Sequence, residues 1–200
     1  MRLQRLIVFA TQAEAAATLK TFQARKDLKD SQLYHTDIGS IIITGIGILA
    51  AAQAICRYAH LTSEVWNFGA AGALSDLFAL EQLVQIASVH RNPLVPDYID
   101  ERSQLFQKEV YPPLVIHAEG RHLVSGDYPI HDHTARRNLA KTSDLVDMEG
   151  YGVAHAARYC NLPCQISKVV TDWAQPGGKE LIQQKLAIAS EIIADHLKSK

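Results

Sequence analysis

The feature that most constrains the fold is an alternation between apolar, β-branched runs and helical segments rich in small residues. Runs such as "RLIVFA" and "SIIITGIG" lead into segments expected to be helical, from about Glu14 to Lys26 and through "ILAAAQAICRYAH". Continuous apolar strands that alternate with helices are typical of sheets covered on both faces. We therefore predict an α/β fold, a single domain over residues 1–200 with a mixed, largely parallel central sheet flanked by helices.

The alternation continues along the chain. The segment "EVWNFGAAGAL" is expected to be a strand that runs into a glycine-rich turn, and "EQLVQIASVHRN" a further strand. "RHLVSGD", "DLVDMEG" with its helix, and "CQISKVVTD" follow in the same manner. The closing helix is expected from about Gly178 to Ser199. One side of it carries an apolar stripe, formed by Ile182, Leu186, Ala189, Ile193 and Leu197.

Charge and composition exclude several classes of function. The 20 basic and 21 acidic residues nearly balance, so nothing indicates nucleic acid or a membrane as a partner. The apolar run from Leu6 to Ala10 is too short for a signal peptide, and "IIITGIGILAAAQAI" is too short to span a bilayer. Cys56, Cys160 and Cys164 lack CxxC spacing and are expected to be buried thiols. We predict a soluble, cytoplasmic protein.

Polar residues at the ends of the predicted strands are the best candidates for a functional site, because α/β sheets bind ligands beyond the carboxyl ends of their strands. Three carboxylates, Glu14, Glu149 and Asp172, follow three different strands and predict a convergent acid cluster. Each also has a structural alternative. Glu14 lies in the first turn of its helix and favours the helix dipole there, and Asp172 could cap a helix.

Two further patterns suggest other chemistry. "TGIGILA" resembles the dinucleotide-binding fingerprint, but the acidic residue that should end the next strand is missing, since Glu64 lies at the wrong end of it. His131 and His133 of "HDH" could ligate a metal. They follow a proline turn and precede the basic "ARRNLA", so a solvated helix start is expected instead. The sequence predicts neither a metal site nor an organic cofactor.

Taken together, the motifs resemble a known family. "ITGIGILAAA", "VWNFGAAGAL", "LVSGD", "VDMEGYGVAHAA" and "KVVTDWA" occur in this order and resemble the nucleosidases that cleave 5′-methylthioadenosine and S-adenosylhomocysteine, within the nucleoside phosphorylase superfamily. The start "ATQAEA", with Thr11 three residues before Glu14, also resembles futalosine hydrolases, the menaquinone-pathway relatives. The resemblance runs from the first strand to the last helix and implies a three-layer αβα fold.

The resemblance implies a purine nucleoside N-ribohydrolase and gives the carboxylates roles. Asp172 corresponds to the acid that protonates N7 of the base, so burial beside an apolar surface such as Trp173 should raise its pKa. Glu149 corresponds to the group that accepts hydrogen bonds from ribose hydroxyls, with Met148 against the ribose face. Glu14 corresponds to the base that orients and deprotonates the attacking water.

Further residues of the substrate site are implied by the same resemblance. They are Ala70, Gly72, Tyr128, Ile130, Thr171, Trp173 and Lys168. Three depart from the family pattern: Ala70 stands where nucleosidases often have Ser, Lys168 replaces Arg, and Thr171 replaces Ser. Lysine is a point charge rather than a planar fork, so the geometry of its partners must differ. Pro129 stands where an aromatic residue is frequent, which leaves the stacking of the base open.

The nucleophile is expected to be water. Phosphorylases hold phosphate with arginines and hydroxyl residues on their glycine loops, and neither "FATQAE" nor "NFGAAGAL" contains Arg. Two alternatives stay open: a purine nucleoside phosphorylase, and a catalytically idle nucleoside-binding module.

The substituent at the 5′ position and the oligomer are the least constrained features. Only "WAQPGG" joins Asp172 to the last helix, and this short wall favours S-adenosylhomocysteine or a futalosine-type nucleoside over methylthioadenosine alone. Residues 92–113 contain four prolines and are expected to form a long loop. Family members are commonly homodimers in which a neighbouring loop approaches the site, and this loop is the candidate for that contact.

Overall fold

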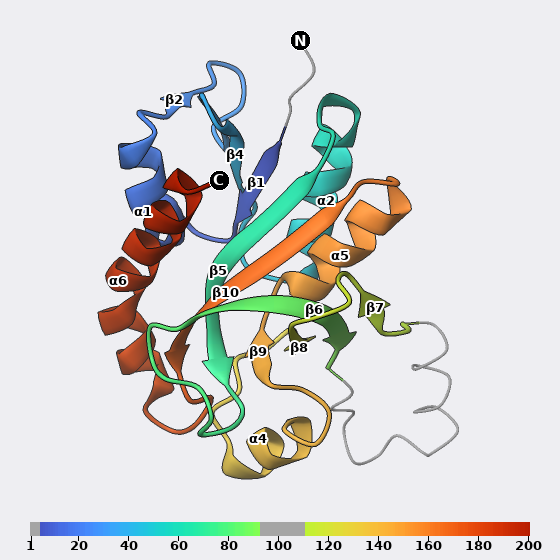
Figure 1. Cartoon of the computed structure of the whole chain (residues 1–200), viewed down its shortest axis with the longest axis vertical. Coiled ribbons are helices and arrows are strands. Elements are labelled where there is room, and N and C mark those ends of the chain that lie inside the picture. The colour runs from blue at the N-terminus through green and yellow to red at the C-terminus, as the bar shows by residue number, and fades with distance from the viewer. Residues whose placement is uncertain (1–4, 93–110) are drawn as a thin grey trace.

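The strands form one large sheet, and the helices pack against it (Figure 1). The computed structural model describes residues 5–92 and 111–200. The strands are β1 (Leu6–Phe9), β2 (Arg25–Lys26), β3 (Leu33–Thr36), β4 (Gly39–Ile43), β5 (Val65–Ala73), β6 (Leu83–Arg91), β7 (Leu114–Val115), β8 (Arg121–Ser125), β9 (Leu145–Asp147) and β10 (Cys164–Asp172). The helices are α1 (Gln12–Thr21), α2 (Ile48–Tyr58), α4 (His133–Leu139), α5 (Gly150–Tyr159) and α6 (Gly178–Lys198), with a 3-10 turn at Ala59–Leu61.

The sheet is mixed. Its strands follow the order β10-β6-β8-β9-β5-β1-β4-β3-β2, and β7 pairs with β6. Because β10 also pairs with β5, the strands β5, β9, β8, β6 and β10 form a closed ring of pairings. Among the described strands, five pairings are parallel and five antiparallel. The predicted mixed sheet is therefore present, whereas the predicted excess of parallel pairing is not confirmed.

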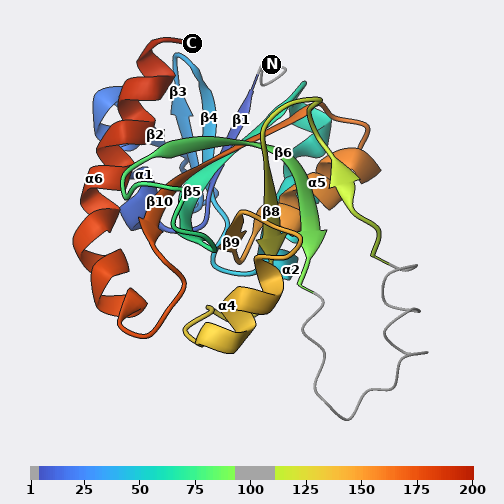
Figure 2. The ribbon, with the colours of Figure 1, turned by 60° about the horizontal axis from the view of Figure 1, so that its bottom comes forward.

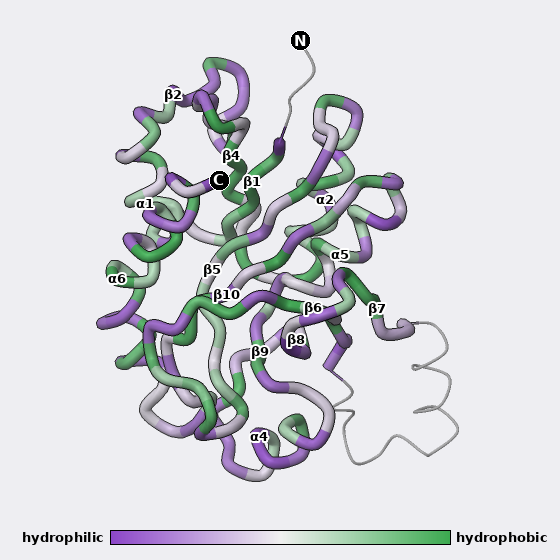
Figure 3. The backbone as a smooth tube through the Cα atoms, in the orientation of Figure 1, coloured by the Kyte–Doolittle hydropathy of each residue, from purple (hydrophilic) through white to green (hydrophobic). Residues whose placement is uncertain are grey.

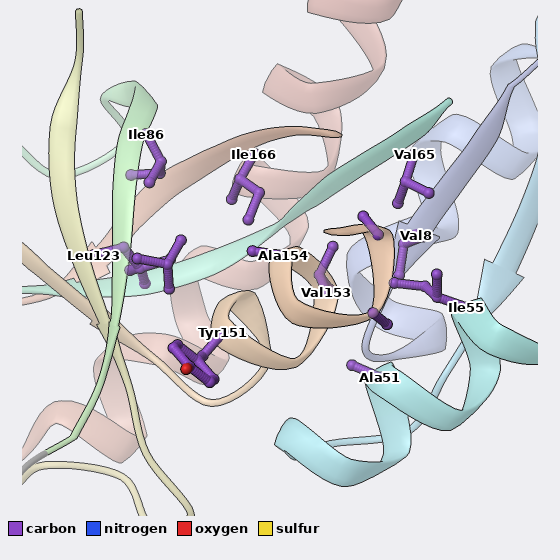
Figure 4. Packing of buried hydrophobic residues seen from close by; sticks show 14 of the residues in the cluster. Val8, Ala51, Ile55, Val65, Ile86, Leu123, Tyr151, Val153, Ala154 and Ile166 are labelled. Atoms are coloured by element: carbon purple, nitrogen blue, oxygen red, sulfur yellow. The ribbon is translucent and has the colours of Figure 1, made fainter. Parts of the chain in front are cut away.

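Two pairs of helices cover the sheet. Helices α1 and α6 pack against each other at one side, and α2 packs against α5 at the other, in both views of the ribbon (Figures 1 and 2). The buried apolar side chains divide accordingly. One cluster joins β-strand residues such as Val8 and Val65 to Ile55 of α2 and Val153 of α5 (Figure 4). A second lies beneath α1 and α6. Apolar residues run along β1, which is buried throughout (Figure 3).

Most predicted elements are present, with shifts at their ends. Strand β5 continues through Gly69 and Gly72 to Ala73, so the predicted glycine-rich turn is wrong. The first helix ends at Thr21 rather than near Lys26, because the chain there turns into the short strand β2. Strands β3 and β7 were not expected, because they are short and have no long apolar run.

Four other predictions concern the apolar run near the start of the chain, the cysteines, a membrane span and the loop at 92–113. The apolar run after the first residues is the buried strand β1. Cys56 is exposed and Cys160 and Cys164 are partly so, which corrects the prediction of buried thiols. No helix in the described part of the chain is long and apolar enough to cross a bilayer. The predicted loop at 92–113 lies almost wholly outside the described residues.

Candidate active site

A cavity of about 300 Å³ opens where several strands end. Its walls come from the ends of β1, β5, β9 and β10, from the loop between β8 and α4, and from α6. All three predicted carboxylates, Glu14, Glu149 and Asp172, line it although they are far apart in sequence. The predicted convergent acid cluster is thus assembled by the fold, and each member is nearly inaccessible to solvent.

Glu14 combines its structural alternative with a place in the cavity. Its Oε2 accepts hydrogen bonds from the N–H of Thr11 at 2.9 Å and from the Thr11 hydroxyl at 3.0 Å, which completes a capping box at the start of α1. Its Oε1 accepts the N–H of Ala70 at 2.9 Å. A Cβ at Gly69 would lie 2.7 Å from the same oxygen, so a side chain there would displace the carboxylate of Glu14.

Glu149 lies where β9 gives way to α5. Its Oε1 accepts the N–H of Gly47, the residue before α2, at 2.9 Å. Burial, together with the negative charge of Asp147, raises the pKa of Glu149 to about 7. Close packing of α5 at this point depends on Gly152, because a Cβ there would come within 2.1 Å of the carbonyl oxygen of Ile48. A small residue in the first turn of α5 therefore allows this helix to pack closely against the start of α2.

Asp172 ends β10 and is 3% exposed. Its Oδ2 accepts the N–H of Ala174 at 2.8 Å, and the Thr171 hydroxyl donates to its Oδ1 at 3.4 Å. Burial raises the pKa of Asp172 above its usual value in spite of these bonds, as predicted for a group that acts as an acid. Trp173, which the sequence placed beside this carboxyl in the substrate site, does not line the cavity and packs against the larger apolar cluster.

Lys168, predicted as a residue of the substrate site, does not line the cavity but pairs with Asp147, which does. Its Nζ is 2.8 Å from Oδ2 of Asp147, and both side chains are almost fully buried. Asp147 in turn accepts the Ser125 hydroxyl at 2.5 Å, and Ser125 accepts the N–H of Tyr151 at 2.8 Å. Burial alone would lower the pKa of Lys168, but the charges of Asp147 and Glu149 raise it overall. Lys168 is therefore a charged support for the acid cluster.

The remaining predicted site residues divide between the cavity and the surface. Five line the cavity: Ala70, Gly72, Ile130, Met148 and Thr171. Tyr128 does not line it and is 78% exposed.

Sequence reasoning missed several cavity residues. Asp147 was not singled out, although its place two residues before Glu149 in "DMEG" put it at the same strand end. Ile182 and Leu186 were assigned to the apolar stripe of α6, and they line the cavity instead of the core. His131 also lines it.

The prediction of a solvated helix start at "HDH" holds for its last two residues only. Asp132 caps α4 by accepting the N–H of Ala135 at 2.7 Å, and His133 is exposed. His131 is partly buried in the cavity wall. Among the described residues, no group of three or more His, Cys, Asp or Glu side chains could hold a metal ion.

The arrangement suits acid–base chemistry on a small molecule. A carboxyl group with a raised pKa can donate a proton near neutral pH, and neighbouring carboxylates with different surroundings can accept one. The walls are otherwise mainly apolar, which is typical of pockets for small organic ligands.

The fold and the cavity together define an α/β protein with a buried, carboxylate-lined site at the ends of its strands. The family model of the Phosphorylase superfamily matches residues 4–199. The chain therefore belongs to the phosphorylase superfamily. A search of curated proteins finds no matching sequence.

Solved structures with the same fold include three instructive examples. A Helicobacter pylori MTAN mutant with 5′-methylthioadenosine in its active site is 17% identical, with a TM-score of 0.78 over 100% of this chain and 98% of that one. An MTAN variant from Chlamydia trachomatis bound to MTA is 24% identical, with a TM-score of 0.75 over 96% and 94%. Futalosine hydrolase of H. pylori is 18% identical, with a TM-score of 0.76 over 98% and 97%. At these identities the likeness establishes the fold alone.

Proposed function

We propose that this protein is a purine nucleoside N-ribohydrolase that cleaves the N-glycosidic bond of a 5′-substituted purine nucleoside. The observation that carries the proposal is the convergence of Glu14, Glu149 and Asp172 in one cavity. Structural likeness to methylthioadenosine nucleosidases and to a futalosine hydrolase supports the same class of reaction. The resemblance also implies a cytoplasmic homodimer.

Asp172 is the proposed acid. Protonation at N7 lets the purine leave with the electron pair of the C1′–N9 bond, while positive charge develops on the ribose ring. The group that supplies this proton must stay protonated near neutral pH, and the raised pKa of Asp172 supports this role. Its position at the buried end of β10 keeps competing water away from the carboxyl.

Glu14 and Glu149 serve the other half of the reaction. Glu14 is the proposed base, which takes a proton from water while the oxygen of that water bonds to C1′. Glu149 is the proposed acceptor for ribose hydroxyls, with Met148 against the sugar. Their backbone donors, the N–H groups of Ala70 and Gly47, hold both carboxylates in place before substrate arrives.

Water is favoured over phosphate as the nucleophile. No Arg or Lys of the described chain lines the cavity, and the buried Lys168 is paired with Asp147. Phosphate would enter among three carboxyl groups without a cation to offset its charge, which is electrostatically unfavourable. This feature supports hydrolysis over phosphorolysis.

The proposed substrates are methylthioadenosine, S-adenosylhomocysteine and aminodeoxyfutalosine or futalosine. Residues 173–177 alone connect β10 to α6, and this short wall favours the futalosine-type nucleosides, which would place the enzyme in menaquinone biosynthesis. Apolar side chains of α6, Ile182 and Leu186, are available to contact a substituent.

Release of free purine from the three nucleosides tests the proposal. Each is incubated with the protein in phosphate-free buffer and again with phosphate, and the sugar product is identified by mass. We expect free ribose derivatives at a rate that does not depend on phosphate. A phosphate-dependent rate with a sugar 1-phosphate product would indicate a phosphorylase. Tight binding without release of base would indicate an idle binding module.

A further inference from the structure

His131 is a cavity residue to which neither the resemblance nor the acid cluster gives a role. It lies in the loop between β8 and α4, in the wall that also contains Asp172. Its backbone is held from both sides, since Ile130 is buried in an apolar cluster and Asp132 caps α4. The ring therefore occupies a fixed place in the wall.

The Nδ1 atom of His131 is buried and has no hydrogen-bond partner. A buried polar atom without a partner destabilises the protein, so such atoms call for an explanation. This one is in a residue that lines a cavity of a ligand's size. A polar group of a bound ligand would supply the missing partner.

The atoms around Nδ1 indicate which part of the ligand would supply this hydrogen-bond partner. A Cβ placed at Gly178, the first residue of α6, would lie 2.9 Å from Oδ2 of Asp172 and 3.3 Å from Nδ1 of His131. The two polar atoms therefore lie near each other at the start of α6, in a wall that both residues share. A ligand group adjacent to the one bound by Asp172 would meet His131.

Purines carry two polar groups side by side on this edge. N7 is an acceptor, and the neighbouring 6-substituent is a donor in adenine and an acceptor in 6-oxopurines. An imidazole nitrogen serves either one, because it accepts through its lone pair or donates through N–H according to the tautomer. We propose that His131 binds the 6-substituent of the purine and so determines which bases the enzyme accepts. This inference rests on the proposed function, with Asp172 at N7.

A comparison of variants and substrates tests the assignment. Rates are measured for His131→Ala and for wild type on three nucleosides that share the same 5′ group. The purine of each carries an amino group, an oxo group or hydrogen at position 6. We expect kcat/KM of the variant to fall by about 10-fold or more for the 6-amino or the 6-oxo substrate. With hydrogen at position 6, the variant and wild type should agree within about 2-fold, since no bond is lost.

The pattern of losses identifies the role. A loss confined to the 6-amino substrate assigns Nδ1 as the acceptor, and a loss confined to the 6-oxo substrate assigns it as the donor. Equal losses on all three substrates, or none, would overturn the assignment. His133→Ala, at an exposed histidine that begins α4 two residues further on, is the matched control and should leave all three rates unchanged. If His131→Ala does not fold, His131→Asn replaces it.

Failure of the proposed function is distinguishable from failure of this inference. If wild-type protein releases no purine from any of these nucleosides, both the proposed hydrolase activity and the proposed role of His131 are contradicted. Wild-type release with an unchanged substrate ranking in the variant would contradict only the role of His131.

Discussion

At the scale of single residues, the site depends on carboxyl groups held in surroundings that alter their protonation. Glu149 shows this most directly, because its pKa is raised to about 7 from an ordinary value of 4.5. The folded chain therefore binds more protons at this group than the unfolded chain does between these two pH values. The free energy of unfolding should fall as the pH rises through that window.

The variant Glu149→Gln tests this linkage. It removes the titrating group. Between about pH 4.5 and 7, the free energy of unfolding of the variant should therefore fall less than that of wild type, and the two falls should differ by up to about 3 kcal/mol. Burial raises the pKa of Asp172 as well and lowers those of His90 and His196, so the comparison between variant and wild type is the informative quantity. Urea unfolding at several pH values measures it.

The control for this experiment is Glu191→Gln, a change of the same chemistry at an exposed position of α6. It should reproduce the wild-type dependence on pH. Identical slopes for wild type and Glu149→Gln would show that Glu149 titrates normally.

Sequence reasoning could select acidic residues that follow predicted strands, because α/β sheets bind ligands beyond the carboxyl ends of their strands. Glu14, Glu149 and Asp172 belong to this group, and all three line the cavity. Asp147 and His131 were missed for physical reasons. The partner of Asp147 is Lys168, far away in sequence, and only the fold brings their side chains to 2.8 Å. For His131, burial of a single ring nitrogen depends on Gly178 of a distant helix.

At the scale of elements, the contact between α2 and α5 controls the geometry of Glu149. The residue before α2, Gly47, donates its N–H to this carboxylate, and α5 starts directly after it. Gly152 makes the close approach possible, because any Cβ would overlap the carbonyl oxygen of Ile48. Packing between two helices is therefore part of the candidate site.

Gly152→Ala should separate these helices. We expect it to destabilise the protein by about 1–3 kcal/mol or more, since a backbone oxygen cannot move away as a flexible side chain can. The KM for nucleoside should rise as well, because the N–H of Gly47 shifts away from Glu149. Thermal unfolding and steady-state kinetics measure the two effects.

Arg158→Ala, on the exposed side of α5, is the control and should change neither quantity appreciably. Unaltered stability of Gly152→Ala would show that α2 and α5 do not approach as closely as described.

Elements differ in how well the sequence predicted them. Long helices with an apolar stripe, such as α6, begin and end close to the expected residues. The continuation of β5 through its glycines was not predicted, because the reasons for those glycines are tertiary. At Gly69 the carboxylate of Glu14 occupies the place of a side chain, and at Gly72 a Cβ would lie 3.2 Å from Oδ2 of Asp172.

At the scale of the whole molecule, the closed ring of strand pairings and the two helix pairs bring distant segments to one cavity. Its walls come from residues as far apart in sequence as Ala10 and Leu186. The alternation of strands and helices predicted the layers. It did not predict the balance of parallel and antiparallel pairs, because strand direction depends on connections that have no local signature.

The proposed hydrolysis of nucleosides depends on Asp172 as the acid that protonates the purine. The most direct test compares purine release by wild type and by Asp172→Asn in phosphate-free buffer, with substrate binding measured in parallel. We expect the variant to bind nucleoside and to lose at least about 100-fold in kcat, because an amide cannot supply the proton. Asp195→Asn, remote in the last turns of α6, should keep wild-type activity. Near-normal release by Asp172→Asn would contradict the account, whereas loss of turnover with binding retained would support it.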